Sequence, residues 1–164
     1  MAIGAGGVDL GTLQNAGAAP KLIRASKTFT GAANLGAVGD CPLFTTTGRC
    51  LLGGMAVYCA TTLSDTVDGA QFNIGFTGAT SAIFIQDTLD LDLIVAGSWL
   101  AGSDPGTVDV AEGQWFQPNA PFDANITMTV ATQAITGGVL EFYVMYYPLS
   151  AGAGLSLGTG MVAI

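Results

Sequence analysis

The chain contains no histidine among its 164 residues. Histidine supplies the general base in Ser-His-Asp and Cys-His catalytic groups, and it is the commonest metal ligand. Those catalytic groups are therefore excluded, and without a Cys-x-x-Cys pair a zinc site is not expected either. We predict no catalytic residue, no cofactor and no metal, and hence a protein that is not an enzyme.

Charged side chains are also scarce. They make up 10% of the residues, while 50% are hydrophobic and the mean hydropathy is +0.54. A folded monomer of this size exposes roughly 7,500 Å², which leaves about 470 Å² for each charged side chain. Buried cores of protein interfaces are depleted in charge. We therefore expect other protein chains to cover part of the surface, as in an obligate oligomer.

The few basic residues argue against binding to nucleic acid. The net charge is −8 and the isoelectric point is about 4.1. Four cations are too few to neutralise an extended run of phosphates. Three of them are close together, which a solvated strand face explains equally well. The four basic residues are Lys21, Arg24, Lys27 and Arg49.

Long apolar runs are missing too. A membrane-spanning helix needs about 20 largely apolar residues, and here every long apolar segment is interrupted by glycine, glutamate or proline. Residues Met1–Gly7 carry no basic residue before their apolar positions, which a secretory signal would have. We expect neither a membrane segment nor an export signal.

Three cysteines, Cys41, Cys50 and Cys59, are too few for a disulfide framework. Cysteine packs as a small hydrophobic residue, so buried, reduced thiols are the favoured interpretation. A single disulfide between two of the three remains open.

Several segments alternate between apolar and polar residues, as half-buried strands do. Lys21–Thr30 and Gln71–Thr77 are two examples. In each, one face should point into a core and the other outward. The inward sets are Ile23, Ala25 and Phe29 in the first segment, and Phe72, Ile74 and Phe76 in the second.

The segment Arg49–Thr62 is apolar on both alternating faces, so we expect a strand buried on both sides, with its outer face against another subunit. Gly53-Gly54 predicts a bulge or a close backbone approach. The two predicted faces are Cys50, Leu52, Ala56 and Tyr58, and Leu51, Met55, Val57 and Cys59.

Near the C-terminus, Asn125–Thr132 and Val139–Leu149 predict an antiparallel hairpin with its turn at Thr136–Gly138. Weaker strands are expected at Pro42–Thr46, Ile83–Ile85, Thr107–Val110 and Gln114–Phe116, with a turn at Asp104–Gly106. Leu89–Val95 fits a strand or a short helix.

About eight short strands separated by turn residues predict an all-β protein, a jelly-roll-like antiparallel β-sandwich. We expect the sandwich to span residues 21–149. Residues 1–20 and 150–164 are rich in glycine and alanine. We expect them to form arms, either flexible or laid along neighbouring subunits.

Four patterns could carry chemistry, and each has a simpler interpretation. Gly154–Gly158 matches Gly-x-Ser-x-Gly, but without a base or a strand-turn-helix context the match is a coincidence. Asp87, Asp90 and Asp92 lack the spacing of a calcium loop, so a solvated edge is favoured. Glu141 lies in an apolar strand, where Arg24, Lys27 or Arg49 could pair with it across a sheet or a subunit interface.

The fourth pattern is aromatic. Such side chains form sugar-stacking surfaces, but in apolar strands they more often belong to a core or a subunit contact. The residues concerned are Trp99, Trp115, Tyr143, Tyr146 and Tyr147.

Two long segments resemble small structural proteins encoded near the head genes of tailed bacteriophages. They are RASKTFTGAANLGAVGDCPLFTTTGRCLL at Arg24–Leu52 and ITGGVLEFYVMYYPLSA at Ile135–Ala151. The resemblance implies a capsid decoration or cement protein, a homotrimer on the outer capsid surface of the virion. Its partner would be the major capsid protein, across whose junctions it would bind.

We therefore expect a structural protein that stabilises a shell by adding contact area. The competing hypothesis is a receptor- or glycan-binding head of a phage fibre or spike with the same β architecture. Stoichiometric copies on particles would favour the first hypothesis, and saccharide binding by exposed aromatic residues would favour the second.

Overall fold

The structure is a computed structural model that describes residues 19–67, 69–77, 83–87, 91, 94–100 and 121–164. These residues form strands, turns and bends, with a 3₁₀-helical position at Leu91, and no α-helix occurs among them. The strands are β1 (Lys21–Thr28), β2 (Gly39–Thr47), β3 (Cys50–Asp65), β4 (Gln71–Phe76), β5 (Ile83–Asp87), β6 (Trp99–Leu100), β7 (Pro121–Phe122), β8 (Ile126–Ala131), β9 (Ile135–Pro148), β10 (Gly154–Leu157) and β11 (Met161–Ala163).

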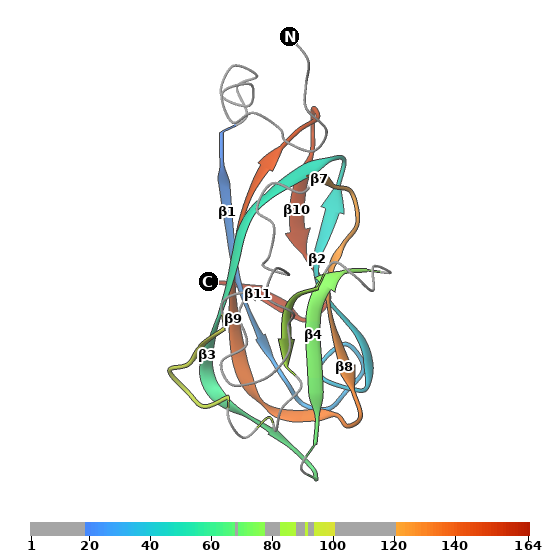
Figure 1. Cartoon of the computed structure of the whole chain (residues 1–164), viewed down its shortest axis with the longest axis vertical. Coiled ribbons are helices and arrows are strands. Elements are labelled where there is room, and N and C mark those ends of the chain that lie inside the picture. The colour runs from blue at the N-terminus through green and yellow to red at the C-terminus, as the bar shows by residue number, and fades with distance from the viewer. Residues whose placement is uncertain (1–18, 68, 78–82, 88–90, 92–93, 101–120) are drawn as a thin grey trace, which may run out of the picture.

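The strands form two antiparallel sheets. The six-stranded sheet has the order β11-β1-β9-β3-β6, with β7 also paired to β3, and the five-stranded sheet has the order β10-β2-β8-β4-β5. Figure 1 shows the long strands β3 and β9 with β1 on one side of the molecule, and β2, β4 and β8 on the other. The predicted all-β, antiparallel sandwich is confirmed.

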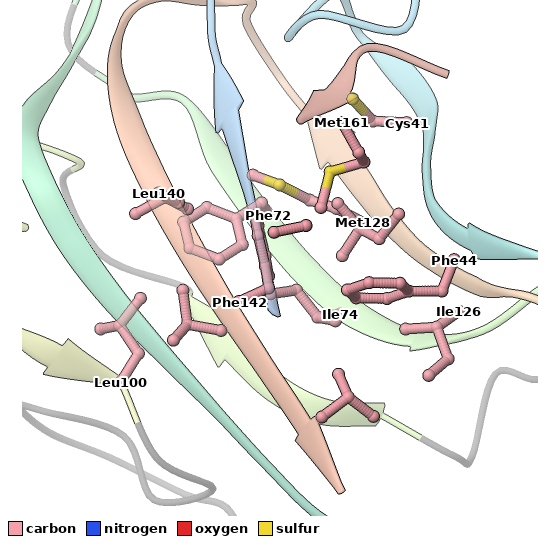
Figure 2. Packing of buried hydrophobic residues seen from close by; sticks show 14 of the residues in the cluster. Cys41, Phe44, Phe72, Ile74, Leu100, Ile126, Met128, Leu140, Phe142 and Met161 are labelled. Atoms are coloured by element: carbon pink, nitrogen blue, oxygen red, sulfur yellow. The ribbon is translucent and has the colours of Figure 1, made fainter. Parts of the chain in front are cut away.

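The core lies between the two sheets and is built by alternation. In β9, Leu140, Phe142 and Val144 are buried, whereas the residues between them lie on the outer side. The ring of Phe142 meets Phe44 of β2 edge to face, with centroids 6.5 Å apart. Figure 2 shows this packing between the layers. Burying aromatic and branched side chains from both sheets supplies most of the driving force for folding.

The predicted hairpin between the segments at Asn125 and Val139 is wrong. β8 pairs with β2 and β4, whereas β9 pairs with β1 and β3, so consecutive strands lie in different sheets. Three residues link them, and Thr132 has a positive φ of 67°. The expected turn at Thr136–Gly138 is instead part of β9, where register shifts mark irregular pairing with β3.

Residues 150–164, expected to form an arm, contribute to both sheets. β10 pairs with β2, and β11 pairs with β1. Gly158 is required by a close approach of the backbone, since a Cβ there would lie 2.7 Å from the carbonyl oxygen of Pro42. Most of the expected N-terminal arm, residues 1–18, lies outside the described residues, as do the predicted features at Asp104–Gly106, Thr107–Val110 and Gln114–Phe116.

Strands occur at two further predicted segments. Gln71–Thr77 becomes β4, with Phe72 and Ile74 buried, and Ile83–Ile85 lies in β5. Of Leu89–Val95 only residues 91, 94 and 95 are described, outside any strand. The bulge predicted at Gly53-Gly54 is confirmed by the register shift between Leu52 and Gly54.

Candidate functional site

The outer face of the six-stranded sheet carries an ordered set of large side chains. The register defines three rows that cross the sheet. The first contains Val162, Ser26, Glu141, Tyr58 and Trp99, the second Arg24, Tyr143 and Ala56, and the third Leu22, Met145 and Gly54. We call these eleven residues the aromatic face.

The bulge in β3 decides which residues reach this face. Before the bulge Cys50 and Leu52 are buried in the core; after it Val57 and Cys59 take the buried positions. One extra residue in a strand reverses the phase of the side chains that follow. Tyr58, predicted to share a face with Cys50, therefore points to the other side.

Three aromatic rings, from β9, β3 and the edge strand β6, cluster on this face. The centroid of Trp99 lies 4.9 Å from that of Tyr58 and 5.7 Å from that of Tyr143, with interplanar angles of 46° and 43°. Separations in this range are typical of favourable aromatic pairs. Trp99 nevertheless remains 57% exposed. The rings thus hold one another in place, while Trp99 remains accessible to a partner.

On β3, glycine and alanine leave part of the aromatic face without large side chains. A Cβ added to Gly54 would meet no atom within 4 Å, and the next outward position of β3 is Ala56. The absence of larger side chains leaves the sides of Tyr58 and Tyr143 uncovered from that direction. A partner's side chain can approach the backbone there.

One polar group is built into the face. The hydroxyl of Tyr143 donates a hydrogen bond of 2.7 Å to Oε2 of Glu141. This bond, with lesser contributions from desolvation and from the carboxylate charge, raises the pKa of Tyr143, and nearby Arg24 opposes the shift. Arg24 is the cross-strand neighbour of Tyr143 and lies diagonally from Glu141.

Within the described part of the chain, the side chain that donates a hydrogen bond to Glu141 is Tyr143, not one of the three expected cations. Pairing of Glu141 with a cation across a subunit interface stays a prediction. Of the three cations considered, Arg24 lies on the same face as Glu141. Lys27 points into the sandwich, from the opposite side of β1.

Apolar side chains continue the face beyond the rings. Leu22 is 62% exposed, Met145 39% and Val162 63%. Single exposed apolar residues are ordinary, but a contiguous group of them marks an interaction site more often than chance.

Lys27 is the second unusual feature, and it is fully buried. Its ammonium group donates hydrogen bonds of 2.9 Å to the carbonyl oxygen of Pro42 and 2.8 Å to that of Thr159. These bonds join β1 of one sheet to β2 of the other and to the β10–β11 turn. Burial lowers the pKa of Lys27, an effect that its interaction with Cys41 opposes. The predicted solvated strand face is therefore wrong at this position.

The three cysteines are buried and unpaired, as favoured from the sequence. Cys41 donates to the carbonyl oxygen of Asn34 at 2.8 Å. Burial raises the pKa of Cys50 and that of Cys59. A raised pKa keeps a thiol protonated and weakly nucleophilic at neutral pH, so Cys50 and Cys59 pack rather than react.

The other sequence candidates do not form a reactive group among the described residues. Ser156 lies on strand β10, and its hydroxyl donates to the carbonyl oxygen of Thr45 at 3.4 Å. Tyr146 is buried in the core, on the opposite side of β9 from Tyr143. Trp115, Asp90, Asp92 and the side chain of Asp87 lie outside the described part.

Within the described residues, no cluster of three metal-ligating side chains occurs. That part of the chain also forms no helix of the length and hydropathy needed to cross a membrane.

Sequence reasoning missed two participants, Tyr58 and Lys27. The signal for Tyr58 was present, because a bulge at Gly53-Gly54 implies a change of phase after it. Lys27 shares its parity with Ile23, Ala25 and Phe29, which places it on the inward face of its strand. Because Lys27 is charged, we expected it on a solvated face instead.

No protein-family model matches the chain, and no curated protein or solved structure matches it either.

Proposed function

We propose that this chain is a non-enzymatic structural subunit of a tailed-bacteriophage virion, which decorates and stabilises the capsid. The observation that carries the proposal is the aromatic face. In the assembled particle this face is covered by protein.

The composition of the face supports this role. Protein interfaces are enriched in tyrosine, tryptophan, methionine and arginine, and residues of these types make up much of the aromatic face. Tyrosine, tryptophan and arginine are also the residues that contribute most to binding energy. Trp99 and Tyr143 are the expected anchors, since their rings adjoin each other and Trp99 is 57% exposed.

The rest of the proposal comes from the sequence. The segments Arg24–Leu52 and Ile135–Ala151 resemble phage head-associated structural proteins, and the scarcity of charge fits a surface that other chains cover. Together they support a location on the outer capsid surface, with the major capsid protein as a partner. The homotrimer implied by the resemblance remains a prediction.

Purified particles test the role directly. Quantitative mass spectrometry should find this chain in a fixed ratio to the major capsid protein, at many copies per particle. Particles made without the chain should release their DNA at a lower temperature, and adding back the purified protein should restore the wild-type temperature. Absence of the chain from mature particles would contradict the proposal.

A glycan-binding head is the second candidate, and the exposed ring of Trp99 beside the Tyr143–Glu141 hydrogen bond favours it. Sugars stack on exposed aromatic rings and donate hydrogen bonds from their hydroxyls to neighbouring carboxylates. A glycan array probed with the wild-type protein and with Trp99→Ala distinguishes the two functions. Binding that disappears in the variant would support a glycan-binding role, and no binding by the wild type would remove it.

A further inference from the structure

The charges of the aromatic face are self-complementary. Arg24 and Glu141 lie in adjacent rows on neighbouring strands, one positive and one negative. We propose that the aromatic face pairs with the same face of a second copy about a two-fold axis, with Arg24 of each copy opposite Glu141 of the other. The inference rests on the proposed role as an assembly subunit and names the partner of its principal surface. It puts a two-fold dimer in the place of the homotrimer that the resemblance implies, because an isologous contact does not build a cyclic trimer.

Local charge favours a second copy. Two chains that each carry a net charge of −8 repel one another on average. On the aromatic face the described charges are those of Arg24 and Glu141, which cancel. Asp40, by contrast, lies on the outer face of the other sheet. Of the two outer sheet faces, the aromatic face therefore brings two acidic copies together at the lower electrostatic cost, as far as the described residues show.

Two-fold symmetry forms the ion pair twice. In an isologous contact, residue i of one copy meets residue j of the other, and j meets i. The two-fold axis lies in the plane of the interface and passes midway between Arg24 and Glu141. Rotation about this axis places Arg24 of one copy over Glu141 of the other, and Glu141 of the first over Arg24 of the second. Tyr143, the neighbour of both, then lies beside the axis and faces its own copy.

The same operation covers the exposed apolar residues. With strands about 4.8 Å apart and rows about 6.8 Å apart, it brings Trp99 of one copy over Met145 of the other. It also brings Tyr58 over the region between Leu22 and Met145. Contacts between thioether sulfur and aromatic rings are favourable. The low positions at Gly54 and Ala56 leave room for this approach.

Charge reversal with complementation tests the pairing. Native mass spectrometry and sedimentation velocity of the full chain should show a species of twice 16.5 kDa. Arg24→Glu and Glu141→Arg should each weaken self-association at least about 100-fold, because each brings like charges together twice. An equimolar mixture of the two variants should restore the dimer, since both ion pairs re-form between unlike copies.

Matched controls show whether the loss is specific. Asp40→Arg and Thr129→Ala alter the outer face of the five-stranded sheet and should leave the dimer intact. Thermal unfolding of each charge variant, followed by circular dichroism, reports whether it is folded. Restoration of the dimer in the mixture also requires both variants to be folded.

Three results would overturn the inference. They are a wild-type protein that stays monomeric at all concentrations, an oligomer that neither charge variant weakens, and variants that fail to complement each other when mixed. A trimer insensitive to both substitutions belongs to the second class. Each of these results leaves the virion role standing, because that role depends on the copies found on particles.

Discussion

The two outer faces of the sandwich differ sharply although their inner faces are alike. The outer face of the five-stranded sheet, which we call the threonine face, presents small and polar residues. Across its strands the register aligns Asp40 with Thr129 and Asn73, and Thr127 with Pro42 and Gly75. The hydroxyl of Thr129 donates to Oδ1 of Asp40 at 3.0 Å. Among the residues of this sheet whose side chains the structure describes, none is a large exposed hydrophobic residue.

The difference separates what folding requires from what association requires. Both sheets bury one apolar face, and that is enough to form the core. On the threonine face, hydrogen bonds within the chain join Thr129 to Asp40 and Thr127 to Thr77. The aromatic face adds large exposed rings that the core does not need. A large exposed hydrophobic surface promotes aggregation unless a partner covers that surface.

The largest expected loss of stability comes from altering the buried side of β9, and altering its outer side should cost much less. Phe142→Ala removes a fully buried ring and should lower the free energy of unfolding by about 3–5 kcal/mol. Tyr143→Ala, one residue further on, should lower it by about 1 kcal/mol or less, through lost aromatic contacts. Urea unfolding of both variants measures the contrast. Similar losses in the two would show that the aromatic face belongs to the folding core.

Lys27 and Arg24 offer the same comparison for charge within β1. Lys27→Ala leaves the carbonyl oxygens of Pro42 and Thr159 without their donor. A buried polar group without a partner costs about 1–3 kcal/mol, so we expect a loss of about 3 kcal/mol. Arg24→Ala should change stability by less than about 0.5 kcal/mol, as surface substitutions usually do. Chemical denaturation of both variants checks this, and equal effects would contradict the inward role of Lys27.

Gly158→Ala should weaken the junction that Lys27 holds together. Its new Cβ would lie 2.7 Å from the carbonyl oxygen of Pro42, so the β10–β11 turn must move away from β2. Forcing such a shift in a packed site typically costs about 1–3 kcal/mol. Gly152→Ala is less informative as a control because Gly152 has a positive φ, whereas Gly54→Ala meets open space. A lowered melting temperature in Gly158→Ala but not in Gly54→Ala is the expected result.

Lys27 should also make stability depend on pH. Its pKa in the folded protein is lowered from the ordinary value of 10.5 by burial. Between those two values the unfolded chain binds more protons, so the contribution of Lys27 to the unfolding free energy rises with pH. This contribution is fully present above 10.5 and is lost as the pH falls through the folded pKa.

The wild type should therefore gain stability relative to Lys27→Met as the pH rises toward 10.5. The comparison with a variant is needed because Cys50, Cys59 and Tyr143, whose pKa values are raised, lose stability over the same range. Those groups are present in both proteins and cancel. A difference in stability that is flat or falls with pH would contradict the assignment.

The sequence predicts the alternation of buried and exposed residues well, but not the sheet to which each strand belongs. Phe72 and Ile74 of β4 are buried as expected. The error at β8 and β9 arises because a three-residue link suits a hairpin and a crossing between layers equally well. Only packing decides between them: β9 must cover the region between β1 and β3, and β8 the region between β2 and β4.

The candidate site was predictable only in part. Trp99 and Tyr143 were recognised as aromatic residues that could gather on a surface, but their contact depends on the pairing of β6 and β9 with β3. Pairing partners far apart in the chain leave no local pattern. The C-terminal segment misled for a related reason: its glycines indicate flexibility when read alone, whereas Gly158 is needed where the backbone passes close to Pro42.

The smallest expected effect tests the threonine face itself. Thr129→Ala removes one exposed hydrogen bond to Asp40 and should change the unfolding free energy by less than about 0.5 kcal/mol. It should also leave self-association unchanged, because this face is solvated in the proposed dimer. Sedimentation velocity beside Trp99→Ala makes the comparison, since Trp99→Ala removes an interface ring and should reduce the dimer. If Thr129→Ala reduced the dimer as much as Trp99→Ala, both outer faces would be contact surfaces, and the contrast between them would no longer identify the interface.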